Sequence, residues 1–170
     1  MSEQYRENFE GLRRFAPAAW STIPDLGLYM DQVITFIGRV YEPVYGEDVK
    51  QFLSAPMINN YVKSRLIPRP TGKKYSREQI ALLTMIVALK QVCSMEEIRR
   101  MLTPMEGETV EALYGAFCAR YSRVMRTLQP EEGAEPASAL DLALDLAIRA
   151  SGYHAGCIAA LKADAASKES

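Results

Sequence analysis

Two amides and a lysine lie on one side of a short helix that the sequence predicts over residues 57–66. Wound at about 100° per residue, this segment brings Asn59, Asn60 and Lys63 together. Its other side is apolar and is made by Ile58, Tyr61, Val62 and Leu66. Side-chain amides form paired hydrogen bonds with adenine, and the major groove of duplex DNA admits a helix. The pattern therefore predicts a helix that approaches the edges of DNA bases.

A cationic turn (the basic turn, residues 68–75) follows this helix. Two prolines and a glycine enforce the turn and hold Arg69, Lys73 and Lys74 outward. Over residues 57–102 nine cations stand against three acids, a local net charge of +6 on a chain whose formal net charge is −1. Such local basicity indicates a docking face for nucleic acid. A solvated surface without a partner is the other interpretation.

The predicted DNA-binding residues come from the helix and the basic turn. They are Asn59, Asn60, Lys63, Arg65, Arg69, Lys73, Lys74 and Arg77. We expect the two asparagines and Lys63 to approach base edges. The cations of the basic turn, together with Arg77, are expected to contact phosphates, which position a protein on DNA without reading its sequence.

Other residues that could do chemistry are sparse. His154, the only histidine, and Cys157 are three residues apart and could supply two ligands to a metal. The other two ligands have no obvious source, so packing is the simpler interpretation, and we predict no metal and no cofactor. The sequence has no glycine-rich phosphate loop, and the adjacent Glu96 and Glu97 point apart on a helix. These observations predict that the protein is not an enzyme.

Composition places the chain in a reducing compartment. Its 170 residues suffice for one domain, or one domain with a helical appendage. The three cysteines are unclustered and odd in number, which leaves no complete disulfide framework. The N-terminus has no apolar signal region, and no run approaches 18 apolar residues. We therefore expect a cytoplasmic protein that does not span a membrane.

Helices must position the basic residues. A helix opening at Pro24 and Asp25 is predicted to carry an apolar stripe to Val40. Capping boxes, in which Ser76 pairs with Gln79 and Ser94 with Glu97, predict two helices after the basic turn. The first of these is apolar on nearly all its faces, so we expect it to be the central buried helix.

The C-terminal part is also predicted to be helical. Residues 110–128 have a strong amphipathic repeat, and residues 129–138 are expected to form a flexible acidic linker. A last helix, from Ala139 to about Ala166, has only a narrow polar stripe of Asp141, Asp145 and Arg149. Such a helix must be buried. We expect it to build a homodimer; the alternative is that it folds back onto residues 110–128.

Three runs of sequence resemble a known family. They are L-Y-M-D-Q-V (28–33), M-I-N-N-Y-V-K (57–63) and K-Y-S-R-E-Q-I (74–80). They are similar to an uncharacterised bacterial family catalogued as domain of unknown function 1836, over about residues 23–130. This resemblance implies no mechanism.

A more distant similarity is to the MerR-like winged helix. Matching positions are Ile58, Tyr61, Leu66, Ile67, Pro68, Tyr75, Ser76, Glu97 and Ile98. The resemblance implies that Asn59 and Lys63 face DNA and that Lys73 and Lys74 belong to a wing. Arg65 stands where that pattern usually has a glycine, so it would bear a steric cost in the left-handed conformation.

Together these observations predict an all-α protein. The resemblance implies a winged helix-turn-helix-like core at residues 23–104, after an N-terminal helical arm at 1–22 and before a C-terminal helical hairpin at 105–170. The predicted function is that of a DNA-binding transcriptional regulator acting on double-stranded DNA. The alternative is a helical protein–protein interaction module that keeps the fold without binding DNA.

Overall fold

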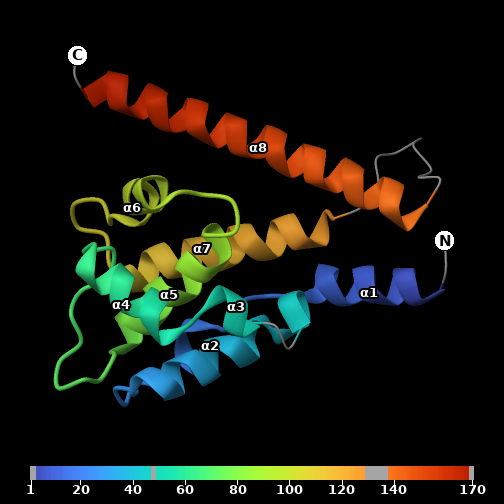
Figure 1. Cartoon of the computed structure of the whole chain (residues 1–170). Coiled ribbons are helices and arrows are strands. Elements are labelled where there is room, and N and C mark those ends of the chain that lie inside the picture. The colour runs from blue at the N-terminus through green and yellow to red at the C-terminus, as the bar shows by residue number, and fades with distance from the viewer. Residues whose placement is uncertain (1–2, 47–48, 129–137, 169–170) are drawn as a thin grey trace.

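The computed structural model describes residues 3–46, 49–128 and 138–168, and over this part the all-α prediction is confirmed. The helices, drawn in Figure 1, are α1 (Glu3–Arg14), a 3-10 turn η1 (Trp20–Thr22), α2 (Met30–Tyr45), α3 (Val49–Phe52), α4 (Ala55–Lys63), α5 (Arg77–Leu89), α6 (Met95–Leu102), α7 (Val110–Arg126) and α8 (Ala139–Lys168). Most of the predicted acidic linker, residues 129–137, lies outside the described residues.

Helix α5 is the centre of the fold, as its sequence predicts. The Ser76 hydroxyl accepts the Gln79 N–H at 3.4 Å, and the Gln79 side chain accepts the Ser76 N–H at 2.7 Å, which completes the predicted capping box. Every residue from Gln79 to Ala88 is buried. Helices α2, α6 and α7 pack around α5. The core therefore surrounds the helix that directly follows the basic turn.

Helix α2 begins later than its sequence predicts. Instead of opening at Pro24 and Asp25, the helix begins at Met30. Leu28 and Tyr75 form an antiparallel bridge, with N–H to O distances of 3.0 and 2.8 Å. The predicted start was wrong because this bridge, whose partner is 47 positions along the chain, holds Leu28 in extended backbone.

The N-terminal arm packs onto the core. Helix α1 lies against α7 and α2. Phe15, just after α1, has its ring centroid 5.7 Å from those of Tyr41 and Tyr121. The Trp20 ring centroid lies 6.1 Å from that of Tyr114, so η1 also packs onto α7.

The last helix is formed as predicted but is mostly on the surface. Figure 1 shows α8 crossing one face of the molecule, next to α6 and α7. Among the residues of α8 whose exposure the structure describes, only Leu142 is buried, whereas Leu140, Leu144 and Ile148 are 60–82% exposed. The expectation that α8 is buried is thus not met within one chain. In the described ranges, no helix combines the length and apolar character needed to cross a membrane.

Candidate functional site

Helix α4 presents the predicted polar side to solvent. Ile58 and Tyr61 are buried against the core, and burial raises the pKa of the Tyr61 phenol, which therefore stays neutral. Asn59, Asn60 and Lys63 are exposed. The division of α4 into a polar side and an apolar side, which was inferred from the sequence, is confirmed.

The end of α4 is a left-handed exit made by Arg65. The Leu66 N–H donates to the Tyr61 carbonyl at 2.9 Å and the Arg65 N–H to the Val62 carbonyl at 3.1 Å, the pair of bonds that defines a Schellman motif. Arg65 has φ +58° where glycine is the usual residue. Its exposed side chain leaves the helix beside Lys63.

The basic turn contains a tight two-residue turn with a lysine at its tip. The Lys74 N–H donates to the Thr71 carbonyl at 3.0 Å. The two residues between them, Gly72 and Lys73, have φ of +57° and +66°, and positive φ at both central positions characterises a type I′ turn. Arg69, on the preceding segment, is exposed together with both lysines.

Contacts at both ends fix the basic turn on the core. The Gln79 side-chain amide donates to the Pro68 carbonyl at 2.9 Å, and Tyr75 is buried in its bridge with Leu28. Arg99 of α6 donates to the Ser64 carbonyl at 2.7 Å, which joins α6 to the end of α4. The backbone that carries these cations is therefore held in place by contacts with the core.

Arg77 differs from the other predicted contact residues because its guanidinium has several partners within the chain. It donates to the Ile23 carbonyl at 3.0 Å and lies 3.6 Å from the Asp25 carboxylate. It also stacks over the Trp20 ring, 5.7 Å from the centroid. These contacts hold the Arg77 side chain against residues 20–25, and its contact with phosphate stays a prediction. The remaining exposed set, the basic face, consists of Asn59, Asn60, Lys63, Arg65, Arg69, Lys73 and Lys74.

Two hollows indent the surface around the basic face. One, of about 570 Å³, is lined by Val62, Lys63, Arg65, Ile67, Pro68 and Arg69. The other, of about 420 Å³, lies between Arg69, Lys74 and Asp25. Lys74 also rests over the exposed Tyr29 ring at 5.2 Å. Concave surfaces rimmed by cations suit phosphate groups of a nucleic-acid backbone.

One carboxylate reduces the positive charge near the basic face. A hydrogen bond with Ser76 lowers the pKa of the Glu78 carboxyl, which is therefore ionised at neutral pH. Glu78 lines the second hollow together with Asp25. The strongest positive potential is thus expected on the side formed by α4 and residues 69–73.

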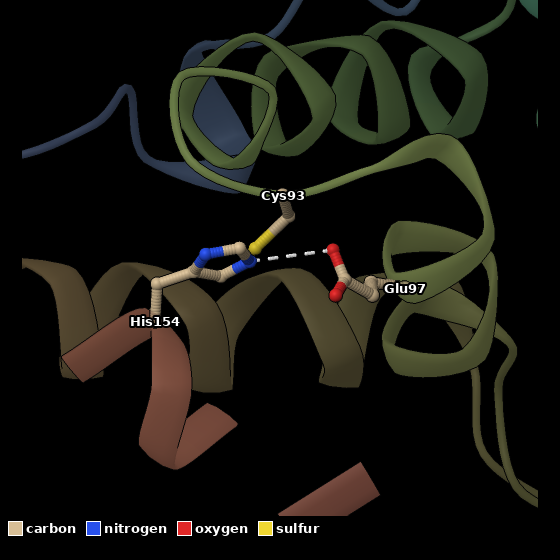
Figure 2. A group of neighbouring side chains, drawn as sticks. All are labelled: Cys93, Glu97 and His154. Carbon is tan, nitrogen blue, oxygen red and sulfur yellow. Dashed lines mark hydrogen bonds and ion pairs between the residues drawn. The ribbon is translucent and has the colours of Figure 1, made fainter. Parts of the chain in front are cut away.

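A second cluster of reactive side chains lies between α8 and the turn that joins α5 to α6. Figure 2 shows Cys93, Glu97 and His154 pointing toward one another. One ligand-type atom from each of these side chains lies within 4.8 Å of the other two. The His154 Nε2 and Glu97 Oε2 atoms are 3.5 Å apart. Cys157, about one turn further along α8, has its thiol 3.9 Å from the Met101 sulfur of α6.

The sequence reveals only half of this cluster. His154 and Cys157 are recognisable from their spacing, but Cys93 and Glu97 lie 57 or more positions away. Their own four-residue spacing places them near one another at the start of a helix, which is the only signal that could have suggested them. Only the fold brings the two pairs together.

Comparison with known proteins identifies a family but no activity. No curated protein and no solved structure is similar enough to the chain to suggest a function, and the MerR-like resemblance stays a prediction from sequence. A family model described as a domain of unknown function, DUF1836, matches residues 18–117, from η1 into α7. Because this match spans more than half of the chain, the protein belongs to the DUF1836 family.

Proposed function

We propose that the protein is a DNA-binding transcriptional regulator that reads duplex DNA with α4 and the basic turn. The observation that supports this proposal is the basic face itself. Its amides and cations are exposed on a helix and a turn whose ends are both fixed on the core. In this proposal α4 is the recognition helix and the tight turn at residues 71–74 is the wing of a winged helix-turn-helix.

The dimensions of α4 suit the major groove. Its nine residues form a helix of about 13 Å at 1.5 Å per residue. The groove is about 12 Å wide, so one end of such a helix can reach base edges while its flanks meet both phosphate backbones. Asn59 and Asn60 would contact bases, and the four cations from Arg65 to Lys74 would contact phosphates.

Backbone strain at two of these cations supports a functional role. Arg65 and Lys73 both adopt positive φ, a conformation in which a residue with a Cβ costs about 1–2 kcal/mol relative to the right-handed form. Glycine would relieve that cost at either position. Strained residues of this kind gather at binding sites, and here both carry a positive charge.

The proposal includes a cytoplasmic homodimer. The three free cysteines suit a reducing compartment. Leu140, Leu144 and Ile148 form an exposed apolar stripe at four-residue spacing on α8. Such a surface is typical of an interface, and a twofold dimer would present two copies of α4 to half-sites about 34 Å apart.

Gel-shift titrations with genomic fragments at two salt concentrations test the proposal. We expect salt-dependent binding. The double variant Lys73→Ala/Lys74→Ala should weaken binding to all fragments and reduce the slope of log K against log salt by up to about 2. Asn59→Ala should instead relax sequence preference. Arg120→Ala/Arg123→Ala, which removes two charges from α7, is the matched control and should leave the slope unchanged.

A helical protein–protein interaction module is the second candidate. An apolar hollow of about 530 Å³ between α7 and α8, lined by Val124, Leu128, Leu146 and Tyr153 among others, favours it. If the wild-type protein shows no salt-dependent affinity for DNA at low ionic strength, the DNA proposal is wrong and the interaction module is preferred.

A further inference from the structure

The cluster around His154 has the composition of a zinc site. Zinc in structural sites takes four ligands from cysteine, histidine and acidic residues in tetrahedral geometry. Cys93, Glu97 and His154 already place one such atom each within 4.8 Å of the others. Cys157 is the fourth candidate, because it follows His154 by three residues on α8, and its thiol lies 3.9 Å from the Met101 sulfur of α6. Thiolates and an imidazole together favour zinc over magnesium or calcium, which bind oxygen.

The spacing of the imidazole and the carboxylate fits two ligands of one ion. The distance from His154 Nε2 to Glu97 Oε2 is 3.5 Å, long for a hydrogen bond between these groups. Two ligands about 2.1 Å from a tetrahedral zinc ion are separated by about 3.4 Å. Small movements of the side chains would therefore suffice for the ion to bind between them.

The surrounding structure supports Glu97 as a ligand. Its Oε2 atom accepts the Ser94 N–H at 2.6 Å in the capping box that opens α6. Hydrogen bonds of this kind orient the carboxylates that bind metals. The predicted capping box would thus have a second role, since it aims the carboxylate at His154.

A separate contact also joins α6 to α8. Arg100 of α6 donates to the Leu161 carbonyl of α8 and lies 3.4 Å from the Asp164 carboxylate. This contact lies about two to three turns beyond His154 along α8. It therefore holds α8 against α6, and Figure 2 shows His154 of α8 beside Cys93 of the α5–α6 turn.

We propose that Cys93, Glu97, His154 and Cys157 form a structural zinc site that fastens α8 to the turn between α5 and α6. The first two residues lie inside the segment matched by the family model, and the last two lie beyond it. The ion would therefore attach the C-terminal helix to the family domain. Binding replaces the protons of both thiols, so no oxidant or reductant is required.

Cobalt titration of the full chain tests the site directly. The protein is purified under reducing conditions and freed of bound metal with a chelator. It is then titrated with Co²⁺ while the visible absorption spectrum is recorded. We expect the intense bands of tetrahedral cobalt with thiolate ligands, saturating at one ion per chain, and their complete loss when Zn²⁺ is added. Zinc should also raise the thermal midpoint of the stripped protein, because the ion binds only the folded chain.

Variants separate this site from any other thiol site. Cys93→Ser, His154→Ala and Cys157→Ser should each weaken cobalt binding by more than the roughly 10- to 100-fold typical of a merely supporting residue. Cys118→Ser, on α7, is the matched control and should bind as the wild type does. His154 lies on α8, which is mostly exposed, so we expect His154→Ala to fold. It therefore still tests the site if Cys93→Ser fails to fold.

Three results would overturn the proposal. They are the absence of tetrahedral cobalt bands at micromolar protein, bands that survive in both His154→Ala and Cys157→Ser, and a reduced protein that binds no metal but forms a Cys93–Cys157 disulfide on mild oxidation. The last result would identify the pair as a redox couple instead.

Discussion

Replacing Arg65 by glycine should stabilise the protein and weaken its binding to DNA at the same time. The left-handed backbone at φ +58° is required by the Schellman motif that ends α4. Glycine adopts this conformation without the steric cost that any Cβ brings. The arginine side chain is exposed, so its removal leaves the core intact.

The magnitude follows from two opposing terms. Relief of the left-handed strain contributes about 1–2 kcal/mol. The greater freedom of glycine in the unfolded chain costs about 0.5–1 kcal/mol relative to alanine. The net gain of Arg65→Gly over Arg65→Ala is therefore between about 0 and 1.5 kcal/mol. For a chain of 170 residues this corresponds to a rise of up to about 6 °C in the thermal midpoint.

Urea unfolding followed by circular dichroism measures the first effect, with Arg65→Ala as the matched control that loses the charge but keeps the Cβ. Gel-shift titration measures the second, where both variants should reduce the salt slope by about 1. A glycine variant less stable than the alanine variant would show that Arg65 is not left-handed. Equal salt slopes for the wild type and both variants would show that Arg65 does not contact DNA.

Three further outcomes are expected. Leu83→Ala, at a position with no exposed surface, should lower the free energy of unfolding by about 2–5 kcal/mol in urea titrations, and an effect under 1 kcal/mol would contradict the assigned core. Ser76→Ala should cost about 0.5–2 kcal/mol, because it removes the cap of α5, while Ser122→Ala on α7 serves as control. Burial raises the pKa of Tyr41 and Tyr114 above the usual value of 10.0, so their contribution to stability is complete below pH 10 and is lost as pH rises further. Phenolate absorbance should then rise together with unfolding, and full phenolate formation in a protein that is still folded would refute this.

Deletion of residues 139–170 tests the homodimer when solution mass is measured together with stability. We expect wild-type protein to sediment as a dimer and the truncated chain as a monomer, because the exposed apolar stripe of α8 is removed. A wild-type particle of 19.0 kDa at micromolar concentration would exclude the dimer.

Local signals in the sequence determined most of the helices and the orientation of α4. The capping boxes at Ser76 and Ser94 satisfy backbone donors within three residues. They can therefore be recognised in the sequence without knowledge of the fold. The burial of α5 follows from its nearly continuous apolar surface. The exposure of Asn59 and Lys63 follows from helical periodicity alone, because Ile58 and Tyr61 must face the core.

Tertiary structure decided where α2 begins, what Arg77 does and which residues meet His154. Leu28 pairs with Tyr75, and this long-range bridge prevailed over the local helix signal at Pro24 and Asp25. Arg77 has the same charge as Lys73 but lies beside Asp25 and the Ile23 carbonyl, so its guanidinium turns inward. Contacts between residues far apart in sequence arise only when the packed helices bring them together. The spacing of these residues along the chain therefore does not predict the contacts. For that reason the sequence alone determined the basic face of α4, whereas the cluster of Cys93, Glu97 and His154 exists only in the folded chain.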